Sequence, residues 1–272
     1  MKIDCHVHIT PPEISKNWEK FAEKEIHFAE LSKSRLNKFA SAEDVVLMLE
    51  QNNFDRAVVF GFGFCDLGLC RYVNDFVIES VKKFPEKLIG FSVVPGCGDA
   101  VQEIERCYSA GLKGVGELFP GFGFDIENER ELSGACKELG IPLLLHANES
   151  IGHSYPGKTD ISLKQLERFI VNNPGLKIIL AHFGGGLLLH ETVKQIRESF
   201  RDVFYDTAAA PFFYDSQIYR VIKTLGMCEK ILFGSDFPLL PHSRTLPDIK
   251  AGGFTGEELC LILGKNAEKL LI

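Results

Sequence analysis

Short apolar runs with the length of a β-strand recur along the chain, and they alternate with segments whose apolar residues have helical spacing. The strand-length runs fall at 2–9, 56–62, 88–94, 112–119, 141–146, 176–182, 203–207 and 231–234. The helical segments fall at 42–52, 75–84, 100–110, 129–139, 163–172, 187–200 and 217–225. Glycine stands where several of these helices must end, as at Gly111, Gly140 and Gly226.

Strands that alternate with helices and are apolar on both faces predict a parallel sheet covered by helices. Eight such units in about 250 residues are the number that closes a barrel. We therefore expect an α/β fold, a (β/α)8 TIM barrel, that forms a single domain over residues 1–272 without an internal linker. Residues 10–40 are too many for an ordinary strand-to-helix loop, and their apolar spacing predicts a helical insertion over the barrel mouth.

Composition and charge narrow the class of protein. Of the 272 residues 45% are hydrophobic and 25% are charged, which is typical of a globular protein with a large core. The net charge of −7 does not favour a nucleic-acid partner. We find neither a run long enough to span a membrane nor a signal peptide, so we expect a cytoplasmic protein without membrane contact. The eight cysteines are scattered without CxxC pairs, which favours reduced thiols.

Ligand-type side chains are placed at the ends of the predicted strands. His6 and His8 lie two residues apart on the first strand, so their side chains share one face and can converge on one ion. The others stand at the carboxyl ends of later strands, where such barrels build their active sites: Glu117, His146, His182 and Asp236. Imidazoles and carboxylates buried together are costly without a cation, so the set predicts a metal site.

These motifs resemble the metal-dependent amidohydrolase superfamily, in the branch that includes aminocarboxymuconate semialdehyde decarboxylase and related decarboxylases and hydrolases. The resemblance covers nearly the whole chain. It rests on Asp-Cys-His-Val-His at 4–8, on His146, on His-Phe-Gly-Gly at 182–185, on Gly-Ser-Asp-Phe-Pro at 234–238 and on Leu-Gly-Lys-Asn-Ala-Glu-Lys-Leu-Leu near the C-terminus. These motifs are specific for fold and metal, and they say little about the substrate.

The resemblance implies roles for the candidate residues. His6, His8 and Asp236 would hold a first metal, and His146 and His182 would hold a second in two-metal members, with Glu117 as the bridge. In one-metal members His146 would join the first metal, and His182 would polarise substrate or position water. We expect one or two divalent ions, with Zn²⁺ favoured by the imidazoles and Mn²⁺ also suited by the carboxylates. Lys113 shares the strand and the parity of Glu117 but stands nearer the strand's start, so we expect it to be structural.

The resemblance implies that Glu117, at the bridge position of two-metal members, favours hydrolysis of a small organic amide, lactone or ester. Metal-activated water would attack the substrate, and Asp236 would serve as general base with His182 as a second catalytic residue. The alternative is non-oxidative decarboxylation of an unsaturated or aromatic carboxylic acid. A metal-stabilised binding barrel without catalysis is least favoured, and the charge argues against a deoxyribonuclease.

Other residues have weaker claims. His153 and Tyr155 follow the fifth strand, and Arg244 follows the eighth, so each is a candidate for substrate binding. Asp206 is expected to orient a metal ligand. The repeated Gly-Phe-Gly-Phe at 61–64 and 121–124 lies on the catalytic face, where the phenylalanines either line a pocket or anchor their loops. The expected partner is a small-molecule substrate, and the sequence leaves open whether the chain forms a homo-oligomer.

Overall fold

A computed structural model describes residues 1–33, 38–95, 100–121, 125–126, 129–149 and 151–272. Its strands form one parallel eight-stranded sheet in chain order, as predicted. The backbone N–H of Cys5 donates to the carbonyl of Phe233, and that of Asp236 donates to the carbonyl of His6, so the segment after the last strand returns to the first. The strands are β1 (Ile3–His8), β2 (Arg56–Phe60), β3 (Leu88–Ser92), β4 (Gly114–Leu118), β5 (Leu143–Leu145), β6 (Ile178–Leu180), β7 (Val203–Asp206) and β8 (Ile231–Leu232).

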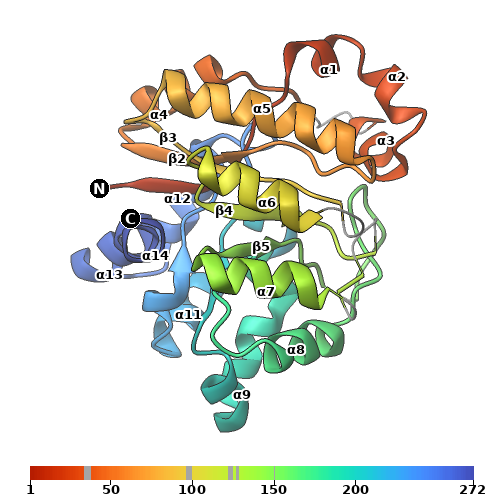
Figure 1. Ribbon diagram of the computed structural model, residues 1–272. Coiled ribbons are helices and arrows are strands. Elements are labelled where there is room, and N and C mark those ends of the chain that lie inside the picture. Colours follow the sequence, from red (N-terminus) through yellow and green to blue (C-terminus); the bar gives the residue numbers. More distant parts are fainter. Residues whose placement is uncertain (34–37, 96–99, 122–124, 127–128, 150) are drawn as a thin grey trace.

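The helices follow the strands around the outside of the barrel (Figure 1). The first of them are α4 (Ala42–Asn52), α5 (Leu67–Lys83), α6 (Ala100–Ser109), α7 (Arg130–Leu139) and α8 (Leu163–Asn172). After β6 come a 3₁₀ segment η1 (His182–Thr192) and α9 (Lys194–Ser199), and after β7 come α10 (Ala210–Phe213) and α11 (Ile218–Thr224). The chain closes with η2 (Cys228–Lys230), α12 (His242–Ala251), α13 (Gly256–Cys260), η3 (Leu261–Lys265) and α14 (Asn266–Leu271).

Two helices differ from the sequence prediction for local reasons. Helix α5 begins at Leu67 rather than near residue 75, because the Asp66 side chain accepts a hydrogen bond from the N–H of Leu69 and caps the helix. The helix predicted over 187–200 is divided, since Val193 has an extended backbone between η1 and α9. By contrast, α4 and α8 have the predicted bounds.

The long insertion after β1 is helical, as expected. It forms α1 (Pro12–Lys16), α2 (Trp18–Ala22) and α3 (Ile26–Lys33), which lie together on one side of the molecule while both termini lie on the other (Figure 1). The Glu25 carboxylate accepts hydrogen bonds from the N–H groups of Cys65 and Asp66, at 2.9 and 3.1 Å. This partly buried contact joins the insertion to the loop that follows β2.

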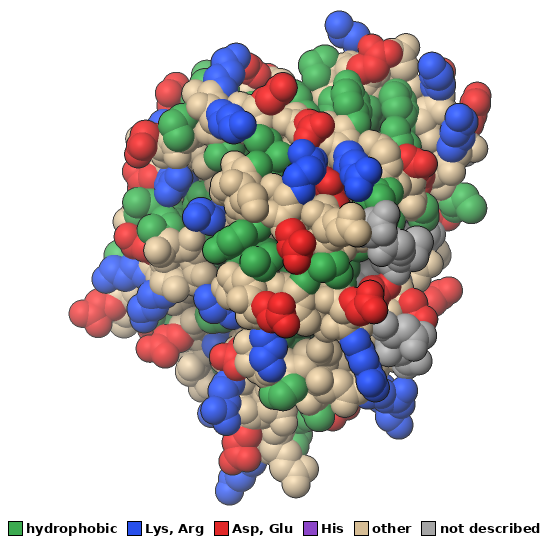
Figure 2. All heavy atoms as spheres, in the orientation of Figure 1, with side chains coloured by type: hydrophobic (Ala, Val, Ile, Leu, Met, Phe, Trp, Pro, Cys, Tyr) green, Lys and Arg blue, Asp and Glu red, His purple; other side chains and the backbone are tan. Residues whose placement is uncertain are grey.

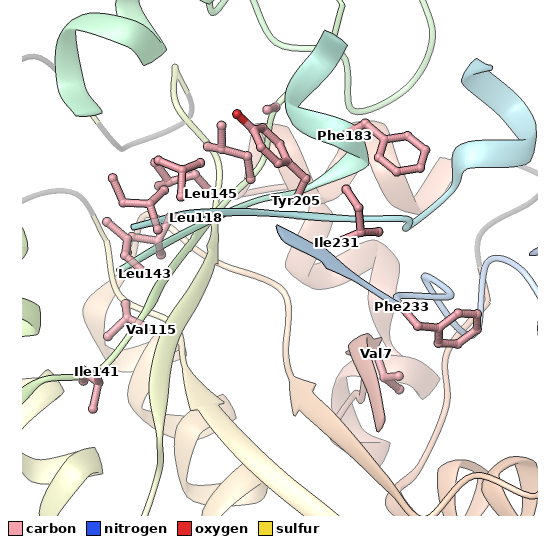
Figure 3. Packing of buried hydrophobic residues seen from close by; sticks show 14 of the residues in the cluster. Val7, Val115, Leu118, Ile141, Leu143, Leu145, Phe183, Tyr205, Ile231 and Phe233 are labelled. Atoms are coloured by element: carbon pink, nitrogen blue, oxygen red, sulfur yellow. The ribbon is translucent and has the colours of Figure 1, made fainter. Parts of the chain in front are cut away.

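Buried apolar side chains fill the space between strands and helices. Figure 3 shows part of this cluster, in which Val115 and Leu118 of β4 lie close to Leu143 and Leu145 of β5. On the face drawn in Figure 2, acidic and basic side chains are intermixed and no histidine is visible. Among the residues that the structure describes, no helix is both long and apolar enough to cross a bilayer.

Candidate metal centre

The six predicted ligands meet at the carboxyl end of the barrel. His6 and His8 lie on β1, Glu117 lies on β4, and the other three stand within four residues after the ends of β5, β6 and β8: His146, His182 and Asp236. None of the six residues is more than 7% exposed. Residues separated by more than 200 positions in the sequence thus share one buried polar volume.

Four ligand atoms form a first group around the end of β1. Nε2 of His6 lies 3.4 Å from Oε2 of Glu117, and Nε2 of His8 lies 3.6 Å from the same oxygen. Oδ1 of Asp236 lies 3.8 Å from Nε2 of His6 and 3.5 Å from Nε2 of His8. Two imidazole nitrogens and two carboxylate oxygens at these separations can surround one divalent cation.

A second group shares the Glu117 carboxylate. Its Oε1 atom lies 2.9 Å from Nδ1 of His146 and 3.7 Å from Nε2 of His182, and these two ring nitrogens are 3.2 Å apart. The ligand atoms of His6, His8 and Glu117 all lie within 4.8 Å of one another, and so do those of Glu117, His146 and His182. Glu117 therefore stands between the groups, with one carboxylate oxygen directed to each.

An irregularity in β4 turns Glu117 into the barrel. The pairing of β4 with β5 shifts register between Val115 and Leu118, and Gly116 has a positive φ of 127°. A Cβ atom on Gly116 would lie 2.2 Å from the backbone oxygen of Leu144, so only glycine fits there. The parity argument that grouped Lys113 with Glu117 is therefore wrong, because a bulge breaks the alternation. Lys113 is exposed, and Val115 lies in the layer between strands and helices.

Hydrogen bonds on the far side of two rings fix which nitrogen can bind a metal. Nδ1 of His6 lies 2.8 Å from Oδ2 of Asp206, and Nδ1 of His182 lies 2.8 Å from the carbonyl oxygen of Ala208. Both partners are acceptors, so each Nδ1 carries hydrogen and each Nε2 of the neutral ring presents a lone pair to the centre. Asp206 thereby orients a ligand, as the sequence suggested.

The charge state of the site suits a cation. Burial lowers the pKa of His8 to about 3 and that of His182 to about 4. Burial opposes ionisation of Glu117, but His6 and His146 outweigh it and hold the pKa of its carboxyl well below the usual value. Burial also opposes a charge on His6, yet Asp206 and Glu117 raise its pKa. A proton on His6 thus compensates the carboxylates where no metal does.

Nε2 of His6 faces the other candidate ligands, is buried, and has no hydrogen-bond partner within the described part of the chain. A buried polar atom that stays unpaired costs free energy, and a metal bond would satisfy this nitrogen. The donor set therefore fits a divalent cation held by imidazole and carboxylate.

A cavity of about 680 Å³ opens above these ligands. Its polar floor is formed by His8, Glu117, His146, His182 and Asp236. Its walls are mostly apolar, and include Leu31, Phe62, Phe119, Ile151, Phe212, Phe213, Tyr214 and Leu239. Leu31 and Lys38 come from the inserted segment, which therefore covers the barrel mouth as predicted.

Two of the three residues that the sequence offered as candidates for substrate binding line the cavity. His153 and Tyr155 line it, whereas Arg244, near the start of α12, is not among its lining residues. Phe62 lines it and stacks on His8, with ring centroids 4.9 Å apart, so the first phenylalanine loop contributes to the pocket. The second loop cannot be placed, because Phe122 and Phe124 lie outside the described residues.

Sequence analysis missed several residues that line the cavity or pack behind its wall. Phe119 stacks on His146 at 4.6 Å, and His27 from α3 lies 4.0 Å from the Phe119 ring. Glu149 lines the cavity and accepts a hydrogen bond from the Tyr155 hydroxyl at 3.1 Å. Phe119 and Glu149 each stand within three residues of a predicted ligand, and that proximity is a usable signal. His27 carried no such signal, since it comes from the insertion.

Comparison with known proteins agrees with this geometry. The sequence profile of the amidohydrolase family matches residues 3–271, so the chain belongs to that family. It is 23% identical to 2-amino-3-carboxymuconate-6-semialdehyde decarboxylase of Dictyostelium discoideum, over 100% of this chain and 91% of the relative. The resemblance inferred from the sequence motifs is therefore confirmed, and the chain is a metal-dependent enzyme of this family with a His and Glu metal site.

Solved structures show the same fold. The 5-carboxyvanillate decarboxylase of Sphingomonas paucimobilis superposes with a TM-score of 0.76 at 14% identity, covering 99% of this chain and 98% of that chain. A dihydroxybenzoic acid decarboxylase from Polaromonas with bound manganese gives 0.72 at 18% identity, covering 99% and 96%. A probable 2-pyrone-4,6-dicarboxylic acid hydrolase from Acinetobacter baumannii gives 0.68 at 17% identity, covering 99% and 98%.

Proposed function

We propose that this protein is a metal-dependent, non-oxidative decarboxylase of an aromatic or conjugated carboxylic acid. The observation that carries the proposal is the cavity, whose floor is the metal-ligand set and whose walls are largely aromatic and aliphatic. Such a chamber suits a planar apolar ring with a carboxylate directed at the floor. Several relatives named above are decarboxylases of acids of this kind.

Sequence analysis had ranked hydrolysis first, on the position of Glu117 alone. The relatives favour decarboxylation, and the apolar walls of the cavity suit the apolar ring of such a substrate. Manganese in the Polaromonas structure also makes Mn²⁺ as good a candidate as the Zn²⁺ first favoured from the imidazoles.

In this proposal His6, His8 and Asp236 hold the cation. The bound cation supplies positive charge that attracts the substrate carboxylate and offsets the negative charge that develops on the ring. Phe62, which stacks on His8, keeps water from one side of that position. In the reaction the bond between ring carbon and carboxyl carbon breaks, CO₂ leaves, and the ring carbon keeps the electron pair and takes up a proton.

Two side chains of the chain are placed to deliver that proton. Asp236 and His182 both line the cavity, and His182 is held by its Nδ1 hydrogen bond to Ala208. Nε2 of His182 therefore faces the centre, where it can carry a proton during turnover. Asp236 can carry a proton on its carboxylate in the same way. His153 and Tyr155 remain candidates for contact with the distal part of the substrate.

The test uses acids labelled with ¹³C in the carboxyl group. A panel of hydroxybenzoic, methoxybenzoic and conjugated dienoic acids is incubated with the Mn²⁺-loaded and the Zn²⁺-loaded protein, and ¹³C NMR follows labelled CO₂ and bicarbonate. We expect release from at least one acid, and none with the His6→Ala/His8→Ala variant. Release by that variant at the parent rate, or hydrolysis of esters or lactones with no release from any acid, would contradict the proposal.

Metal-dependent hydrolysis is the second candidate, favoured by the carboxylate of Glu117 between the two ligand groups. Glu117 would contribute one carboxylate oxygen to each of two cations, and those cations would supply activation of water for hydrolysis. Reaction in H₂¹⁸O separates the two functions. A hydrolase places solvent oxygen in its product, whereas decarboxylation places none in the organic product.

A further inference from the structure

Asp4 lies beneath the metal ligands and is completely buried. Its Oδ2 atom accepts a hydrogen bond from the Ser235 hydroxyl at 2.5 Å and lies 2.7 Å from Nε2 of His242. Its Oδ1 atom accepts from the N–H of Ser235 at 2.9 Å and from the N–H of His6 at 3.2 Å. One carboxylate on β1 thus receives donors from its own strand, from the loop after β8 and from α12.

This cluster continues into the backbone of Asp236. The Ser235 hydroxyl accepts a hydrogen bond from the N–H of Phe237 at 3.0 Å, and the N–H of Asp236 donates to the carbonyl of His6 at 3.0 Å. Asp236 itself has a left-handed backbone with φ of 66°, which a residue with a side chain rarely adopts. Hydrogen bonds on both sides of Asp236 therefore maintain a conformation that the residue alone disfavours.

His242 is held firmly enough to anchor the cluster. Its ring packs against Phe54 and Phe233, with centroid distances of 4.4 and 5.1 Å, and none of its surface is exposed. With the ring fixed in this way, Nε2 points at Asp4. Since Asp4 is an acceptor, His242 donates from Nε2.

We propose that Asp4, Ser235 and His242 are positioning residues for the metal centre. Through Ser235 they set the backbone of Asp236, and through the N–H of His6 they set the strand that carries the first two histidines. Their action on metal affinity rests on the proposed role of Asp236 as a ligand. None of the three lines the cavity, so their effect is on the ligands and not on the substrate.

The test measures metal binding without turnover. Metal-free protein is titrated with Co²⁺ alone, and its visible absorption reports both the dissociation constant and the ligand geometry. His242→Leu and Ser235→Ala each remove a donor to Asp4, whereas His242→Gln keeps an N–H donor near the position of Nε2. Tyr205→Phe is the matched control, because it removes another buried hydrogen bond, 2.8 Å to Glu191, in which none of the proposed ligands takes part.

We expect His242→Leu and Ser235→Ala to weaken Co²⁺ binding about 10- to 100-fold and to alter the absorption band. His242→Gln should restore both, and Tyr205→Phe should lower the melting temperature and leave both unchanged. Parent-like affinity and spectrum in both His242→Leu and Ser235→Ala would overturn the proposal. Parent-like binding by Asp236→Ala would instead remove Asp236 from the ligands and overturn its premise. Neither result depends on whether the enzyme decarboxylates or hydrolyses.

Discussion

Oδ2 of Asp206 lies 2.8 Å from Nδ1 of His6, on the opposite side of the imidazole from the nitrogen that faces the other ligands. The other oxygen, Oδ1, accepts hydrogen bonds from the N–H groups of His182 and Ala208 at 2.9 and 3.0 Å. The orientation of this carboxylate is therefore fixed by the backbone, and it decides which tautomer His6 adopts.

Asp206→Asn should reverse that tautomer. The two backbone N–H groups would retain the amide oxygen, so the amide NH₂ would face Nδ1 of His6. Nδ1 would then become an acceptor, Nε2 would carry the hydrogen, and His6 could no longer bind metal. We expect metal affinity to fall at least about 10- to 100-fold in calorimetric titration. Parent-like affinity in Asp206→Asn would contradict this account of the His6 tautomer.

Gly116→Ala should disrupt both folding and the site. Its Cβ would meet the backbone oxygen of Leu144 at 2.2 Å, and β4 would have to move and carry Glu117 with it. We expect the free energy of unfolding, measured by urea denaturation, to fall by about 4 kcal/mol or more. Gly134→Ala in α7 is the control, because it meets nothing within 4 Å. That variant should gain about 0.5–1 kcal/mol, and equal stability of the two variants would refute the steric argument.

Removing the metal should lower stability without unfolding the barrel, because the apolar core does not depend on the ion. A cation that binds only the folded state adds about 2.7 kcal/mol at a free concentration 100 times its dissociation constant. We therefore expect chelation to lower the melting temperature in scanning calorimetry, and Mn²⁺ or Zn²⁺ to restore it. The His6→Ala/His8→Ala variant should not respond. An identical response of parent and variant would place the stabilising ion elsewhere.

Glu103 on α6 should make stability depend on pH. Burial opposes its ionisation, but hydrogen bonds from Arg106 and Asn74 outweigh burial and lower its pKa from 4.5. Because the folded state prefers the charged form, its stabilising effect is present above pH 4.5 and is lost as pH falls below that value. Glu103→Gln should cost about 1–3 kcal/mol at neutral pH.

The measurement is urea unfolding of the parent and Glu103→Gln at several pH values. The difference in unfolding free energy between them should shrink as the pH falls below 4.5. Glu105→Gln, exposed on the same helix, should match the parent throughout. A difference between parent and Glu103→Gln that grows in acid would reverse the sign argued here.

The fold and the meeting of the six candidate residues at one end of the barrel could be predicted because each has a local sequence signal. Strand and helix periods gave the barrel, and placement at strand ends gave His146, His182 and Asp236. The inward turn of Glu117 could not be derived from alternation, since it depends on Gly116 and on the neighbouring strand. The contact of His242 with Asp4 could not be predicted, because it joins residues 238 positions apart. The cavity walls were missed in part for the same reason, as Phe212 and Phe213 come from a distant segment.

The most direct test of the central claim is an anomalous difference map at the manganese absorption edge, from crystals of the Mn²⁺-loaded protein. The account predicts a peak at coordination distance, about 2.0–2.2 Å, from Nε2 of His6, Nε2 of His8 and a carboxylate oxygen of Asp236. A map without a peak among these side chains, or with its strongest peak bound by other residues, would contradict the proposed metal centre.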